Sequence, residues 1–226
     1  QGDYWRYGAA EFGDVNGDGA PDLVIAQIRD NDPTHLTQSS FVLLNDGRGY
    51  FPQENAMRLP LPAFYHGYTS ATFGSSWDMN GDGLKDIVML HTRNDDVSGA
   101  DVEPAWTGMY IQFLQQRPDG QFVDVTAARI PDQGAWTGPA ERGDAASAQP
   151  FDLNRDGIMD LVIGYGWARP ATATPVVLMG TADGRFVPAD PALLTGGARW
   201  FGEGAVAALD GANLEALFVS PTYFRR

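Results

Sequence analysis

Short apolar stretches rich in β-branched residues recur along the chain, and each follows an acidic, glycine-containing loop. Three of them, at residues 23–26, 87–90 and 161–164, have the pattern of a buried strand. Each loop is preceded by a stretch of small residues that would form the strand entering it, at residues 9–12, 70–73 and 145–148. The pattern therefore predicts pairs of strands joined at the acidic loops.

A second apolar stretch follows in every unit and leads through a polar turn to a Gly-x-Phe sequence. These stretches are residues 41–44, 109–114 and 176–179, and the turns end at Phe51, Phe122 and Phe186. Each is a hairpin signal. Four antiparallel strands in roughly 60 to 70 residues form a unit that is too small to bury both of its faces, and such units stack as the blades of a propeller. The predicted fold class is therefore all-β, with β-propeller blades of four antiparallel strands.

The repeats predict a single propeller segment over residues 1–226, divided at approximately 4–66, 67–140, 141–200 and 201–226. The last repeat is incomplete, and its loop has lost the acidic spacing, so we expect no metal there. About three and a half blades do not close a ring, and an open propeller exposes sheet edges. We therefore expect a piece of a longer propeller or a ring completed by another chain. A closed four-bladed ring is the alternative.

The three acidic loops share the nine-residue pattern D-x-N-x-D-G-x-x-D. Because alternate residues of a tight loop converge on one point, the side chains at positions 1, 3, 5 and 9 and the carbonyl at position 7 can surround a cation. The glycine at position 6 permits the sharp turn. The candidate ligands are Asp14, Asn16, Asp18, Ala20 and Asp22 in the first loop, Asp78, Asn80, Asp82, Leu84 and Asp86 in the second, and Asp152, Asn154, Asp156, Ile158 and Asp160 in the third.

Oxygen ligands alone favour calcium over zinc or copper, so we expect three structural Ca²⁺ sites. An EF-hand would also place a glutamate at position 12, where this chain has Ile25, Met89 and Ile163. Position 9 must then complete the shell, which favours a weak affinity of roughly 10⁻⁴ to 10⁻³ M. The alternative is that these loops are Asp-, Asn- and Gly-rich turns that need no ion. We disfavour it because a turn does not require acids at positions 1, 5 and 9 together.

The composition narrows the range of partners. The chain has a net charge of −14 and no cysteine, which disfavours nucleic acid and anionic membranes as partners and excludes thiolate metal sites. Three bound Ca²⁺ ions would bring this charge to about −8. No apolar run approaches the roughly 18 residues that cross a bilayer, so we expect no membrane insertion.

In its loops and strands the sequence resembles the FG-GAP or VCBS repeats of integrin α-subunit propellers and of many secreted bacterial proteins. The similarity covers nearly the whole chain. It implies calcium held between the first and second strands of a blade, an extracellular, cell-surface or periplasmic bacterial protein, and adhesion as one use among many. A fold shared this widely does not fix a ligand.

The long connections of such blades lie on the face opposite the acidic loops, and we expect a protein or glycan ligand there. Aromatic residues and histidine gather in these connections. The candidate ligand-binding residues are His66, Tyr68, Trp106, Trp136, Trp167 and Trp200. The alternative for the tryptophans is packing between adjacent blades. The same connections contain Arg142-Gly143-Asp144, a tripeptide that integrins recognise but that is short enough to arise by chance.

The sequence contains no H-E-x-x-H, no G-x-S-x-G and no phosphate-binding glycine loop, which argues against catalysis. We therefore expect a non-catalytic, calcium-stabilised module for adhesion, recognition or surface assembly. One alternative is a carbohydrate-active enzyme domain, a propeller-type polysaccharide lyase or hydrolase, for which His66, Tyr68 and Arg142 would be tested first. Another is a structural subunit that assembles through open propeller edges.

Overall fold

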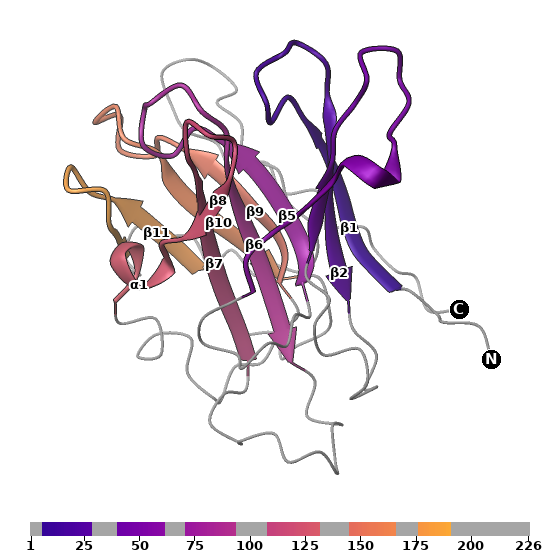
Figure 1. The fold of residues 1–226 in the computed structure, drawn as a ribbon. Helices are drawn as coiled ribbons and strands as arrows, with labels where there is room; N and C mark the ends of the chain where they lie inside the picture. Colours follow the sequence, from indigo (N-terminus) through magenta and orange to yellow (C-terminus); the bar gives the residue numbers. More distant parts are fainter. Residues whose placement is uncertain are drawn as a thin grey trace, which may run out of the picture.

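The computed structural model describes residues 6–28, 40–61, 71–93, 108–131, 145–165 and 176–190. Within these ranges the protein is nearly all β and forms three sheets, each of four antiparallel strands (Figure 1). Strands that neighbour each other in a sheet also neighbour each other in the sequence. This is the up-and-down arrangement of a propeller blade, so the predicted all-β fold of four-stranded units is confirmed.

The strands follow the predicted pattern in each blade. The first blade contains β1 (Arg6–Gly13), β2 (Asp22–Ile28), β3 (Phe41–Leu43) and β4 (Ala56–Arg58). The second blade contains β5 (Ala71–Trp77), β6 (Asp86–Arg93), β7 (Gly108–Gln116) and β8 (Phe122–Asp124). The third blade contains β9 (Ala145–Phe151), β10 (Asp160–Tyr165), β11 (Val176–Gly180) and β12 (Phe186–Pro188).

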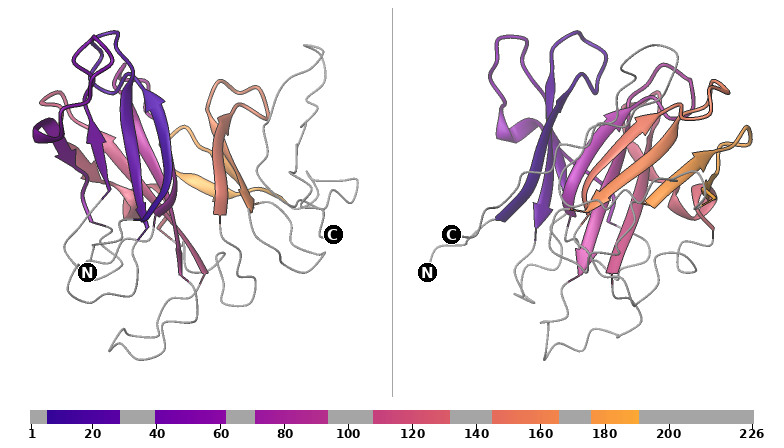
Figure 2. Two further views of the ribbon diagram at one scale, coloured as in Figure 1. Left: turned by 90° about the vertical axis from the view of Figure 1, so that its right-hand side faces the viewer. Right: turned by 180° about the vertical axis from the view of Figure 1, so that it is seen from behind.

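The three sheets lie one after another, with the second blade in the middle (Figure 2). Side chains alternate between the two faces of a strand. In β6, Ile87 and Met89 therefore pack toward the first blade, whereas Val88 and Leu90 pack toward the third. All four are fully buried. The continuous apolar run of β6 is thus explained by burial on both faces.

Two short elements depart from the sequence prediction. The helix α1 (Thr126–Arg129) follows β8, and Thr126 accepts the backbone N–H of Phe113 at 2.9 Å, a tertiary contact that no local pattern reveals. In the first blade the 3₁₀ turn η2 (Gln53–Asn55) separates Phe51 from β4, whereas Phe122 and Phe186 begin their strands. Pro52, which lacks a backbone donor, stands where the other blades continue their ladder.

Several sequence predictions fall outside the described residues. They are the fourth repeat at 201–226, the tripeptide Arg142-Gly143-Asp144, and the ligand candidates His66, Tyr68, Trp106, Trp136, Trp167 and Trp200. No helix in the described ranges is long and apolar enough to cross a membrane.

Candidate metal centre

The acidic loops join the first and second strands of the blades. In the first blade this loop projects from the same end of the sheet as the β3–β4 hairpin (Figure 1). The glycines at position 6, namely Gly19, Gly83 and Gly157, have φ of 86°, 85° and 84°. That left-handed conformation strains any residue with a Cβ atom, so these turns require glycine.

The first five loop positions are held by hydrogen bonds within the loop. Asp14 accepts the backbone N–H groups of Gly17 at 2.8 Å and Gly19 at 2.9 Å, one on each carboxylate oxygen. Asn16 donates its side-chain amide to Asp18 Oδ2 at 2.9 Å and accepts the N–H of Asp18 at 3.0 Å. The other two loops repeat the Asn–Asp exchange through Asn80–Asp82 and Asn154–Asp156. The repeated sequence therefore folds into a repeated local geometry.

The residue at position 9, here called the closing aspartate, is the most buried part of each loop. Asp22, Asp86 and Asp160 are each 0% exposed. In the third blade, Asp160 Oδ2 accepts the N–H of Leu153 at 2.8 Å, and Oδ1 accepts the N–H of Gly180 at 2.9 Å. The closing aspartate thus fastens its own loop to the end of the third strand.

Sequence reasoning assigned the closing aspartates a ligand function and missed this structural one. The partners are the backbone N–H groups of Gln116 and Gly180, the last residues of β7 and β11, and of Asn45, which follows β3 by two residues. They lie 30, 20 and 23 residues from their aspartates. Because these contacts use backbone N–H groups, residue type carries no signal, and the spacing to the aspartate also varies. The one shared signal is that each partner lies within two residues of the end of the second apolar stretch of its unit.

Charge accumulates around the closing aspartates. Burial raises the pKa of the Asp86 carboxyl above its usual value, and the nearby carboxylates of Asp82 and Asp78 raise it further, against the lowering effect of two backbone hydrogen bonds. The pKa of Asp160 is raised in the same way, by burial and by Asp156 and Asp152. The acids of one loop therefore repel one another, and a cation among them would relieve that repulsion.

The donor set of each loop fits calcium chemically, because it consists of carboxylate, amide and backbone carbonyl oxygens. The hydrogen bonds within the first loop place one partner on each oxygen of Asp14 and Asp18, and a carboxylate oxygen has a further lone pair. However, no three acidic or histidine side chains in the described ranges converge as a metal-binding group. The turn geometry is held by hydrogen bonds, and calcium coordination remains a prediction.

His91 is also placed by the structure. Its Nε2 lies 3.0 Å from Gln112 Oε1, and the side chain is 4% exposed. Gln112 in turn donates to Asp124 Oδ2 at 3.0 Å. Burial lowers the pKa of His91 to about 4, so the imidazole is neutral at physiological pH. His91 on β6 is therefore linked through Gln112 on β7 to Asp124 on β8, and its side chain is shielded from solvent.

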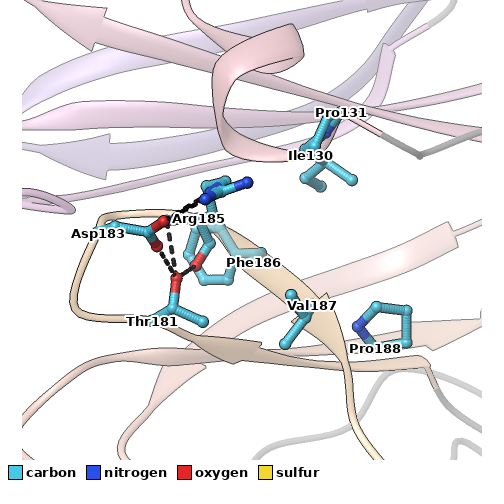
Figure 3. Close-up of a pocket in the computed structure, with 8 residues that line it drawn as sticks. All are labelled: Ile130, Pro131, Thr181, Asp183, Arg185, Phe186, Val187 and Pro188. Carbon is cyan, nitrogen blue, oxygen red and sulfur yellow. Dashed lines mark hydrogen bonds and ion pairs between the residues drawn. The ribbon is translucent and has the colours of Figure 1, made fainter.

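A pocket of about 340 Å³ lies between the end of α1 and the β11–β12 hairpin (Figure 3). Its polar side chains pair with one another: Arg185 Nε donates to Asp183 Oδ2 at 2.7 Å, and Thr181 Oγ1 donates to Asp183 Oδ1 at 2.5 Å. These two hydrogen bonds lower the pKa of Asp183 to about 2. Since the charges compensate each other, this pocket offers little to a charged ligand.

Comparison with known proteins adds one finding to this geometry. The model of a family described as FG-GAP-like repeat matches residues 14–89 and 78–163, and each match runs from one acidic loop into the second strand of the next blade. No curated protein matches the chain. Together the two matches span more than half of the sequence and the three loops described above. The chain therefore belongs to the FG-GAP-like repeat family.

Proposed function

We propose that this chain is a calcium-stabilised propeller module that serves extracellular recognition, adhesion or surface assembly and is not catalytic. The observation that carries the proposal is the threefold repetition of one acidic loop with a fully buried closing aspartate. In the second and third loops, further carboxylates act on this aspartate and help to raise its pKa. Three such loops without cations would add to the self-repulsion of a chain with a net charge of −14.

The proposed ligand is a protein or a glycan, bound on the face opposite the acidic loops. In support, the loop end of the blades is taken up by tight turns whose polar groups largely bond to one another. From the up-and-down order of the described strands we infer that the long connections, with His66, Tyr68 and the four tryptophans named above, would lie on the opposite face. Glycan-array binding with and without chelator tests this ligand.

Thermal unfolding tests the calcium proposal. We expect the melting temperature in about 10 mM CaCl₂ to exceed that in EGTA by on the order of 10 °C, because each ion binds only the folded loop. Mg²⁺ should restore little of this difference, since it demands a stricter octahedral shell. A matched control is the triple variant Asp18→Ala, Asp82→Ala, Asp156→Ala, which should lose the response. Equal melting temperatures of the wild type in both buffers would reject the proposal.

A further inference from the structure

The strand β7 presents two glutamines to the first blade. Gln112 and Gln116 are 2% and 3% exposed and flank the buried Leu114 on one face of the strand. Each donates its side-chain amide to a backbone carbonyl of the first repeat, Gln112 to Pro60 at 3.1 Å and Gln116 to Val15 at 2.9 Å. The junction between the first and second blades is therefore closed by polar contacts on either side of an apolar centre.

Gln116 connects two of the acidic loops. Its backbone N–H donates to Oδ1 of Asp86, the closing aspartate of the second loop, at 2.8 Å. Its side chain holds the carbonyl of Val15, whose own N–H donates to Oδ2 of Asp22, the closing aspartate of the first loop, at 2.8 Å. None of these four residues is more than 3% exposed. A buried chain of hydrogen bonds thus joins the two closing aspartates.

The side-chain amide of Gln116 uses its N–H donor, whereas its oxygen Oε1 accepts no hydrogen bond within the described part of the chain. Because Oε1 is buried, the absence of a partner in the described part of the chain is unfavourable for this polar atom. A methionine would fill a similar volume without an unsatisfied acceptor. The one contribution that a hydrocarbon side chain could not make is the donation to Val15.

The third blade provides an internal comparison. Gly180 occupies the position of Gln116, because its N–H donates to the closing aspartate Asp160 at 2.9 Å. It has no side chain, and a Cβ atom there would collide with the backbone oxygen of Met159. The third loop therefore has no equivalent link to the second.

We propose that Gln116 is a positioning residue that couples the first and second acidic loops, so that ordering of one favours ordering and calcium binding of the other while the third loop acts independently. A shift of Asp86 carries the backbone of Gln116 with it, and the side chain passes that shift to Val15 and Asp22. The calcium part of this coupling rests on the proposed function above.

Hydrogen exchange, followed by mass spectrometry over residues 14–22, 78–86 and 152–160 during a CaCl₂ titration, tests the coupling loop by loop. Asp82→Asn, which weakens the second loop, should raise the calcium concentration for half-protection of residues 14–22 by about fivefold or more. Residues 152–160 should shift by less than about twofold. When Asp82→Asn is made in a chain that already carries Gln116→Met, the calcium concentration for half-protection of residues 14–22 should rise by less than about twofold.

The control is Gln115→Met, which changes the neighbouring side chain on the other face of β7 and should preserve the full shift. If Gln116→Met does not fold, Gln116→Glu replaces it, because a carboxylate cannot donate to Val15. If Asp82→Asn, made in the wild-type chain, does not change the calcium concentration for half-protection of residues 14–22, the coupling is overturned. The proposed calcium function would then still stand. No calcium-dependent protection in any loop overturns the calcium function instead.

A metal-free measurement tests the link by itself. In EGTA, Asp86→Asn should accelerate exchange at residues 14–22 by about fivefold or more, and by less than about twofold in the Gln116→Met background. Equal acceleration in both backgrounds overturns the link through Gln116, whether or not calcium binds.

Discussion

At the scale of single residues, the buried closing aspartates accept the backbone hydrogen bonds that attach each acidic loop to its blade. Asp160→Ala would leave the N–H groups of Leu153 and Gly180 without their acceptor. We expect a loss of about 2–5 kcal/mol in the free energy of unfolding, measured by urea denaturation in EGTA. Asp156→Ala, at an exposed position of the same loop, should lose only about 1 kcal/mol. Similar losses for both variants would contradict the structural function of Asp160.

His91 predicts a dependence of stability on pH. Its folded pKa of about 4 lies below the usual 6.5, so the unfolded chain binds the proton first as the pH falls. The contribution of neutral His91 to the free energy of unfolding should therefore be complete above pH 6.5. It should decline as the pH falls toward 4, by up to about 3 kcal/mol. The measurement is urea denaturation across this window for the wild type and His91→Gln, which does not titrate. The same pH slope in both proteins would show that the histidine is not held neutral.

At the scale of the elements, strands β1 and β5 approach closely where Gly13 meets Ser76. A Cβ atom on Gly13 would lie 2.5 Å from Ser76 Oγ. Gly13→Ala should lower the free energy of unfolding by about 1 kcal/mol, because Ser76 Oγ must rotate away from the new methyl group. Because Ser76→Ala removes the colliding oxygen, the double variant should recover most of that loss in the same denaturation assay. Additive effects of the two changes would mean that this contact does not set the spacing of the strands.

The two blade junctions differ in chemistry although the blades repeat. Between the first and second blades, Gln112 and Gln116 bond to backbone carbonyls. Between the second and third, the rings of Phe113 and Phe186 stack at 5.0 Å. The blades therefore share their strands and loops, whereas the side chains that pack between neighbouring blades differ from one junction to the next.

At the scale of the whole molecule, the first blade has an apolar face that points away from the second. Phe12 on this face is 64% exposed and pairs in register with Leu23, and its ring lies 6.2 Å from that of Phe51. We expect this face to drive self-association at micromolar concentration, measured by sedimentation velocity. Phe12→Ser should weaken it, whereas Tyr50→Ser, at an equally exposed hairpin tip, should not. A wild-type chain that stays monomeric at about 100 µM would contradict this expectation.

Much of the fold could be predicted because its signals are local. The run at residues 87–90 is apolar without interruption, which indicated a strand buried on both faces, and β6 has that environment. Gly83 at position 6 indicated the sharp turn, and its φ of 85° confirms it. The sequence analysis did not anticipate α1, which is held by a distant contact with Phe113, or η2, which follows Pro52.

The sequence by itself determined the strands, the four-stranded blades and the acidic loops, because alternation, turn glycines and a nine-residue spacing act within one segment of chain. Only the tertiary structure decided what the closing aspartates bind, how Gln116 joins two loops and why His91 stays neutral. Each of these depends on which backbone groups meet across a blade or a junction. Residues 15 and 116 meet because two sheets pack face to face, and packing between distant segments leaves no periodic trace in the sequence.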